Sequence, residues 1–301
     1  MREFLKNWVQ GFSMALADSV PGVSGGTIAF VLGFYDKFIN SLNTLISRNG
    51  DKKEAIKFLI KLGIGWIIGM GIASLILSNL FETHIYQVSS LFIGFIIFAI
   101  PLIIKEEKEN VKGKYKNLIF TLIGIVIVSA ITYFNPQTGS GANIDITNLN
   151  LGLALYVFVA GMIAISAMIL PGISGSTLLL IFGLYMPIIT GIKETLHFNL
   201  SYIPVLFVFG LGVIAGIAII IRIVKKALEK YRPQTIYLII GLMIGSIYAI
   251  VMGATTLKVP QEPLALKTFN IVCFVIGGLV ILEMEIIKRK LENKEQKNNG
   301  D

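Results

Sequence analysis

The sequence predicts an all-α polytopic membrane protein built as an inverted repeat, in which each half holds one re-entrant broken helix segment and three transmembrane helices. Three observations predict this architecture. The chain of 301 residues is 54% hydrophobic and only 15% charged, and its mean hydropathy of +0.77 lies outside the range of soluble domains. A Pro-Gly-Ser motif interrupts the apolar sequence twice. All but three of the basic residues fall in alternate loops.

The repeated motif is the feature around which the chain is organised. Its first copy reads Asp18-Ser19-Val20-Pro21-Gly22-Val23-Ser24-Gly25-Gly26-Thr27, and its second copy reads Met168-Ile169-Leu170-Pro171-Gly172-Ile173-Ser174-Gly175-Ser176-Thr177. In lipid, each unpaired backbone N–H or C=O group costs several kcal/mol, so broken backbone at membrane depth is tolerated only where protein or a water-filled cavity covers it. We therefore expect the two broken segments to meet at one site.

The elements of the first half follow in order. A short apolar arm after the basic N-terminus leads into the first motif, and a second short arm, Thr27–Tyr35, leaves it. Neither arm reaches the roughly 20 residues that span a bilayer. Three full-length apolar runs follow, at about Leu59–Leu77, Val88–Ile104 and Leu118–Phe134.

The second half restarts the same pattern after a polar, glycine-rich stretch. Its broken segment has the arms Leu151–Leu170 and Thr177–Ile192, and its apolar runs lie at about Ile203–Ile223, Ile236–Met252 and Phe269–Ile287. We therefore expect a first repeat at 1–135, an extracytoplasmic linker at 136–150, a second, inverted repeat at 151–288, and a cytoplasmic charged tail at 289–301.

Glycine spacings extend the repeat beyond the motifs. Gly63, Gly65 and Gly69 recur with the same spacing as Gly210, Gly212 and Gly216, and Gly124 matches Gly277 less regularly. Close helix packing through small residues explains the two triplets. Three spanning helices per half is an odd number, and it inverts the second half relative to the first.

The basic residues test this topology independently. If the N-terminus is cytoplasmic and each broken segment leaves on the side it entered, all of the 26 Lys and Arg residues except Lys193, Lys258 and Lys267 fall on the cytoplasmic side. This bias follows the positive-inside rule. It places both termini in the cytoplasm and favours re-entrant segments over segments that cross fully.

The motifs predict an anion-binding site. Each ends in a turn of small residues that begins a helix, and the first N–H groups of a helix lack intrahelical partners and carry the positive end of its dipole. Glycines let a ligand approach the backbone, and hydroxyls add donors. The candidate substrate-binding residues are Asp18, Ser19, Pro21, Gly22, Ser24, Gly25, Gly26, Thr27, Pro171, Gly172, Ser174, Gly175, Ser176 and Thr177.

Asp18 stands where the second motif has Met168. Coupling of transport to protons and capping of backbone N–H groups at the first motif are two interpretations of equal weight. No basic residue lies within either motif. Lys61 and Arg222 are candidate cations for the anion, although snorkelling of these side chains toward the membrane interface is the more favoured reading.

Other classes of function find little support. A nucleic-acid-binding protein needs a clustered basic face on a soluble fold. Cys273 is the single cysteine, and the two histidines, His84 and His197, fall in short loops without partners at metal-ligand spacing. The sequence therefore predicts no metal, cofactor, disulfide or catalytic residue. A membrane-embedded enzyme such as a lipid phosphatase would need a nucleophile beside a His or a metal.

The first motif with Gly33-Phe34-Tyr35, and its second copy ending in Leu170-Pro171-Gly172-Ile173-Ser174-Gly175-Ser176-Thr177, resemble the signature of a bacterial and archaeal membrane family formerly described as a domain of unknown function. This is the polyprenyl-phosphate transporter family of the PopT type, and the resemblance covers nearly the whole chain. It implies a plasma-membrane flippase that returns undecaprenyl phosphate, the lipid carrier of cell-wall precursors, to the inner leaflet. It also implies a substrate site at both motifs.

The alternative function is a small-anion channel or exchanger. Chloride-channel proteins also use inverted repeats with glycine-rich turns at helix N-termini. Their order of residues, Gly-Ser-Gly-Ile-Pro, differs from the order here, but the same physics would bind a small anion equally well. The coupling ion and the oligomeric state are left open by the sequence.

Overall fold

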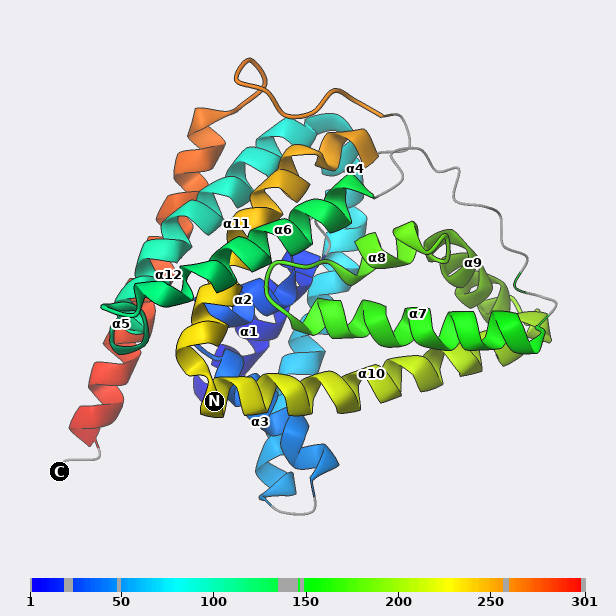
Figure 1. Cartoon of the computed structure of the whole chain (residues 1–301), viewed down its shortest axis with the longest axis horizontal. Helices are drawn as coiled ribbons and strands as arrows, with labels where there is room; N and C mark the ends of the chain where they lie inside the picture. Colours follow the sequence, from blue (N-terminus) through cyan, green and yellow to red (C-terminus); the bar gives the residue numbers. More distant parts are fainter. Residues whose placement is uncertain are drawn as a thin grey trace.

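The computed structural model describes residues 2–18, 24–47, 50–134, 146, 149–256 and 260–298, and all regular structure in this part of the chain is helical (Figure 1). The first half contains α1 (Arg2–Asp18), α2 (Gly25–Val31), α3 (Tyr35–Ile46), α4 (Lys52–Glu106), α5 (Lys108–Val111), η1 (Tyr115–Asn117) and α6 (Leu118–Tyr133). The second half contains α7 (Leu151–Ile169), α8 (Gly175–Ile181), α9 (Tyr185–Leu196), η2 (Leu200–Tyr202), α10 (Ile203–Lys230), α11 (Arg232–Val251), η3 (Gly253–Thr256) and α12 (Ile271–Asn298).

Six helical stretches in the described part of the chain are long and apolar enough to cross a membrane, which confirms an all-α multi-pass membrane protein. They are Lys52–Ala73, Thr83–Glu106, Tyr115–Tyr133, Leu151–Ile169, Leu200–Lys230 and Arg232–Val251. Leu151–Ile169 was expected as an arm of the second broken segment, and it is long enough to span by itself. Within the described residues of α12, Ile271–Glu283 is an apolar stretch that matches the start of the last expected run.

Two further boundaries differ from the sequence prediction. The first two expected runs belong to one helix, α4, which bends at His84, where the backbone leaves helical geometry (φ −134°, ψ 34°). His84 therefore lies in a helix kink rather than in a loop. At the other end of the chain, α12 continues to Asn298, which lies within the segment 289–301 that the sequence predicts as a charged tail.

The packing of the helices recurs in the two halves. Helix α1 packs along α4 as α7 packs along α10, and α6 packs along α11 as α12 packs along α4. Glycines allow α4 to come close to α1 and α10 to come close to α7. A Cβ atom on Gly65 would lie 2.0 Å from the carbonyl oxygen of Trp8, and one on Gly212 would lie 2.2 Å from that of Phe158. The last helix of each half thus packs against the other half.

Glycines also lie at the contacts between the two halves, α4 with α12 and α6 with α11. A Cβ atom on Gly94 of α4 would meet the carbonyl of Phe274 in α12, and one on Gly241 of α11 would meet the carbonyl of Thr121 in α6. Helix interfaces in membranes favour glycine at such points because the backbones can then come into contact. The repeat read from the motifs therefore extends to the packing of the spanning helices.

The glycine triplets are only partly explained by close packing. Gly65, Gly69, Gly212 and Gly216 all lie against a neighbouring backbone, whereas a Cβ atom on Gly63 or Gly210 would meet nothing within 4 Å. Residues four apart share a helix face, but residues two apart do not. The prediction of close packing was therefore wrong for Gly63 and Gly210.

The second motif is the turn of a helical hairpin. In Figure 1, α8 runs back along α7 toward the end at which α7 begins. The chain then bends by 108° between α8 and α9. Helix α2 likewise packs on α1 and is followed at once by α3. This geometry suits the predicted re-entrant segments; their depth in a bilayer and the inverted orientation of the halves stay predictions.

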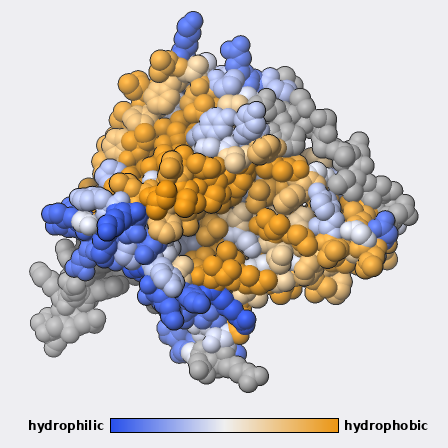
Figure 2. All heavy atoms as spheres, in the orientation of Figure 1, coloured by the Kyte–Doolittle hydropathy of each residue, from blue (hydrophilic) through white to orange (hydrophobic). Residues whose placement is uncertain are grey.

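The surface has the polarity of a membrane protein. Large apolar side chains are exposed along the spanning helices, among them Ile67, Val126, Leu155 and Ile214. Figure 2 shows hydrophobic side chains covering the middle of one face, with hydrophilic ones gathered around α5 and around the start of α4. Helix α11 is the most buried of the six spans, so it forms the centre of the molecule.

An ion-pair cluster joins segments from both halves that were predicted to share the cytoplasmic side. Arg232, at the start of α11, donates from Nη2 to Asp36 Oδ2 of α3 at 3.0 Å and from Nε to Glu107 Oε2 at 3.1 Å. Glu107 lies between α4 and α5. The cluster therefore ties α3, α11 and the end of α4 together.

We expect Arg232→Gln to lower the free energy of unfolding by about 1.5 kcal/mol, because it leaves two carboxylates unpaired while water still screens a side chain that is 34% exposed. Thermal unfolding in detergent, followed by circular dichroism, measures the change. Lys225→Gln is the control, since the pair it breaks with Glu229 is more exposed. Equal effects of the two substitutions would contradict a bracing role for the cluster.

Candidate functional site

The first motif is capped by its own side chains. Helix α1 ends at Asp18, and α2 begins at Gly25 after the N-cap residue Ser24. Ser24 Oγ accepts a hydrogen bond from the backbone N–H of Gly26 at 3.1 Å, and Asp18 Oδ1 accepts one from that of Gly25 at 2.6 Å. Two of the N–H groups that a helix start leaves unpaired are thus satisfied. The candidates Ser19, Pro21 and Gly22 lie outside the described residues.

Asp18 has a second partner, from a helix far along the chain. Its Oδ2 accepts a hydrogen bond from Trp66 Nε1 of α4 at 2.9 Å. A Cβ atom on Gly25 would lie 2.6 Å from the Asp18 carboxylate, so a side chain at this position would displace the carboxylate. The capping interpretation of Asp18 is therefore seen directly, and proton coupling stays a prediction.

The second motif forms the turn between α7 and α8. Gly172 has a φ of +86°, and a Cβ atom on it would lie 2.5 Å from the backbone of Leu242 in α11. Only glycine fits this conformation and this approach. Ser174 is the N-cap residue of α8, and its hydroxyl lies 2.8 Å from that of Ser176 rather than on a backbone N–H. Pro171 and Gly175 are buried.

The structure brings the two motifs together, as the sequence predicted. Ser24 Oγ lies in donor range of the carbonyl oxygens of Met168 (3.1 Å) and Leu170 (3.3 Å). Thr27 Oγ1 accepts a hydrogen bond from the backbone N–H of Gly172 at 2.8 Å. The hydroxyls of the first motif thus satisfy backbone groups at the C-terminus of α7, where helices leave carbonyls unpaired.

The close contact depends on small side chains. A Cβ atom on Gly26 would lie 2.7 Å from the carbonyl oxygen of Ile169, and Tyr35 OH donates to that same oxygen at 3.1 Å. Ser24 and Thr27 are 0% and 3% exposed. The start of α2 and the end of α7 therefore lie on either side of a shared, desolvated seam.

The two helix starts differ in charge. Asp18 places a carboxylate on the N–H groups of α2, whereas the first turn of α8 contains no acidic residue and Met168 occupies the position equivalent to Asp18. A helix N-terminus carries a partial positive charge. That charge is countered by a carboxylate at α2, and no carboxylate of its own segment counters it at α8.

Sequence reasoning missed two residues of this site. Tyr35 was noted only as part of the repeat, although its recurrence as Tyr185 was a signal that could have found it. Trp66 carries no signal in the sequence, because its role depends on how α4 packs on α1. The candidate cations lie elsewhere: Arg222 is exposed on α10, and Lys61 lines a pocket beside α1 and α3.

The comparisons with known proteins agree on one family. Residues 14–268 match the profile described as VCA0040-like, undecaprenyl phosphate translocase-like. The chain is similar to a polyprenyl-phosphate transporter of Staphylococcus aureus (strain NCTC 8325 / PS 47), with 35% identity over 92% of this chain and 95% of that protein. It is also similar to a polyprenyl-phosphate transporter of Vibrio cholerae serotype O1, with 31% identity over 81% of this chain and 76% of that protein. No solved structure matches.

Proposed function

The chain belongs to the undecaprenyl phosphate translocase-like family, and from this premise we propose that it is a polyprenyl-phosphate transporter whose substrate phosphate binds where the two motifs meet. The contact between Ser24 and the carbonyls of Met168 and Leu170 carries the proposal. It supports a single site shared by both halves, as in transporters whose broken helices face each other. The net movement we propose is from the outer to the inner leaflet.

The start of α8 is the proposed first contact for the phosphate. Ser174 and Ser176 hold hydroxyls 2.8 Å apart there, on either side of Gly175. A phosphate oxygen could replace the hydroxyl–hydroxyl bond with two charge-assisted hydrogen bonds, which are about twice as strong as neutral ones. At the start of α2, the ionised Asp18 would repel the phosphate.

Protonation of Asp18 is the proposed coupling step. The carboxylate accepts a hydrogen bond from the N–H of Gly25, as an anionic ligand would. A neutral carboxyl group binds that N–H more weakly, so protonation would free the start of α2 and let the phosphate contact both helices. Phosphate binding and proton binding at Asp18 would then favour each other.

The proposed orientation has both termini in the cytoplasm. The ion pairs of Arg232 with Asp36 and Glu107 support a common side for three loops that the positive-inside rule assigns to the cytoplasm. On the proposed outer side, Tyr86 OH donates to the carbonyl oxygen of Glu262. Accessibility of cysteines introduced at Lys108 and at Glu262 to a membrane-impermeant reagent tests this orientation.

Binding of purified protein to undecaprenyl phosphate, to a neutral polyprenol and to inorganic phosphate tests the substrate. We expect Ser174→Ala to weaken binding of the lipid phosphate about tenfold, the loss of one hydrogen bond to a charged group. Ser24→Ala should weaken it as well, because it loosens the contact between the motifs. Ser166→Ala is the control, since its hydroxyl bonds only to Met162 O within α7.

Three outcomes separate the possibilities. Tight binding that needs both the tail and the phosphate, and that falls in both motif variants, supports the proposal. Equal binding of inorganic phosphate or chloride, weakened by Ser174→Ala, would favour a small-anion channel or exchanger. Lipid binding that neither serine affects would place the substrate elsewhere in the molecule.

A further inference from the structure

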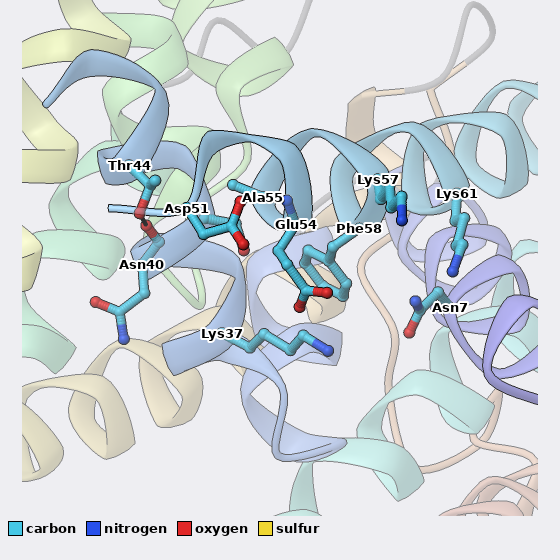
Figure 3. A pocket seen from close by; sticks show the side chains of 11 residues that line it. Asn7, Lys37, Asn40, Thr44, Asp51, Glu54, Ala55, Lys57, Phe58 and Lys61 are labelled. Atoms are coloured by element: carbon cyan, nitrogen blue, oxygen red, sulfur yellow. Dashed lines mark hydrogen bonds between the residues drawn. The ribbon is translucent and has the colours of Figure 1, made fainter. Parts of the chain in front are cut away.

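A polar pocket lies apart from the two motifs, between α1, α3 and the start of α4 (Figure 3). Its volume is about 640 Å³, within the range of small-ligand sites. Asn7 lies eleven residues before Asp18 on α1, which at 1.5 Å per residue separates the pocket from the first motif by about 16 Å. Its lining includes Asn7, Lys37, Asp51, Glu54, Lys57 and Lys61.

The cations of the pocket come from two helices. Lys57 and Lys61 lie one turn apart on the same face of α4, and Figure 3 shows their amines at the end of the pocket that Asn7 occupies. Lys37 reaches in from α3, where its Nζ lies 4.8 Å from the centre of the Phe58 ring. Three ammonium groups therefore border one cavity.

Asn7 supplies the observation that points to a ligand. Its side chain is 3% exposed, and its Nδ2 has no hydrogen-bond partner. A buried donor without a partner is costly, and it is tolerated where something else accepts the hydrogen bond. An anion between Asn7 and the two lysines of α4 would accept it.

Two carboxylates also line the pocket and oppose an anion to different degrees. Asp51 Oδ1 is engaged as the N-cap of α4, accepting from the backbone N–H groups of Lys53 (2.9 Å) and Glu54 (3.1 Å). Figure 3 shows Asp51 at the end away from Asn7, and Glu54 in the middle. Glu54 is thus the acidic side chain nearer to an anion bound at the Asn7 end.

We propose that this pocket binds a phosphate group at its Asn7–Lys57–Lys61 end. Ammonium and amide N–H groups are donors suited to phosphate oxygens, and the remaining volume leaves space for water or for the first carbons of a phosphate ester. Phosphate binding here stands independently of transport. Occupation by the headgroup of the lipid before or after its passage rests on the proposed function.

Isothermal titration of the full-length protein in detergent, with inorganic phosphate and separately with undecaprenyl phosphate, tests the pocket. We expect the double variant Lys57→Gln/Lys61→Gln to weaken inorganic phosphate binding at least about tenfold. Lys52→Gln/Lys53→Gln is the matched control, because it removes the same charge from the first turn of α4 outside the pocket lining. Ser174→Ala should leave this binding unchanged.

The probes identify the source of the phosphate. Loss of inorganic phosphate binding alone assigns the pocket to free phosphate, and parallel loss of undecaprenyl phosphate binding assigns it to the lipid headgroup as well. Unchanged phosphate binding in the pocket variant, or an equal loss in the Lys52/Lys53 control, would overturn the proposal. Neither result would bear on the site between the motifs, which Ser174→Ala tests.

Two single variants test the sign of the charge and the role of Asn7. Glu54→Gln should strengthen phosphate binding severalfold, and weaker binding would mean that the pocket prefers a cation. Asn7→Leu should weaken phosphate binding severalfold without lowering the melting temperature, because it removes a buried donor that has no partner. Gln10→Leu, which removes the similarly unpaired Gln10 Oε1 outside the lining, should leave binding unchanged.

Discussion

Asp18→Ala is expected to abolish transport and to lower the free energy of unfolding by about 2 to 4 kcal/mol. The substitution leaves the backbone N–H of Gly25 and the indole N–H of Trp66 without the acceptors they have in the structure, and each unsatisfied buried donor costs about 1 to 3 kcal/mol. It also removes the side-chain link between the end of α1 and the start of α2. Transport of undecaprenyl phosphate in proteoliposomes and thermal unfolding in detergent measure the two effects.

Asp18→Asn separates capping from proton coupling. Its amide oxygen can still accept one of the two hydrogen bonds, so we expect a loss of only about 1 kcal/mol of stability. If protonation of Asp18 couples to phosphate binding, the affinity of the wild-type protein should gain, relative to Asp18→Asn, as the pH falls through the titration of Asp18. The comparison cancels the titration of the phosphate itself, which has a second pKa near about 6.

A third variant serves as the control for Asp18→Ala and Asp18→Asn. Glu229→Gln removes an acidic charge from an exposed position on α10 and should leave both transport and its pH profile unchanged. Identical pH profiles for Asp18→Asn and the wild-type protein would show that Asp18 only caps the helix. The proposed substrate site would survive that result, because it depends on Ser174 and on the contact between the motifs.

Gly212→Ala is expected to destabilise the protein by about 3 kcal/mol. Its Cβ atom would lie 2.2 Å from the carbonyl oxygen of Phe158, a backbone atom that no change of rotamer can move aside. The helices α7 and α10 would have to separate along an interface built on close contact, and overpacking of this kind costs about 1 to 3 kcal/mol or more. Thermal unfolding in detergent measures the loss.

Gly210→Ala is the matched control in the same helix. Nothing lies within 4 Å of a Cβ atom at this position, so the substitution should be neutral or stabilising by up to about 1 kcal/mol, the difference in helix propensity between alanine and glycine. Gly65→Ala and Gly63→Ala should repeat the contrast between α1 and α4. Equal effects at Gly210 and Gly212 would mean that α7 and α10 do not pack as described.

Helix identity could be predicted from the sequence because it depends on local apolar runs and breaks. The spanning helices in the middle of each half and the contact between the motifs were predicted correctly. Boundaries were less predictable: the α4 helix passes through His84 with a kink, since neighbouring helices can support a distorted backbone where an isolated segment would break. Apolar composition alone does not distinguish those two cases.

The partners of the site residues could not be predicted. Asp18 bonds to Trp66, 48 positions away, and Ser24 reaches carbonyls of the other half. Such contacts depend on how helices pack, and the packing depends on steric fit between glycines and distant backbone. The pocket at Asn7, Lys57 and Lys61 could not be predicted for the same reason. In the sequence the two lysines look like ordinary interfacial residues, and only the packing of α1 on α4 places the unpaired amide of Asn7 beside them.

The sequence by itself determined the membrane class, the internal repeat and the two interruptions, because hydropathy and the cost of unpaired backbone in lipid act on local segments. Only the tertiary structure decided which hydroxyls face the protein, that a carboxylate occupies the start of α2 while the start of α8 has none of its own, and that the last helix of each half packs on the other. These features depend on distances between segments far apart in the chain, and side-chain hydrogen bonds act only over about 3 Å.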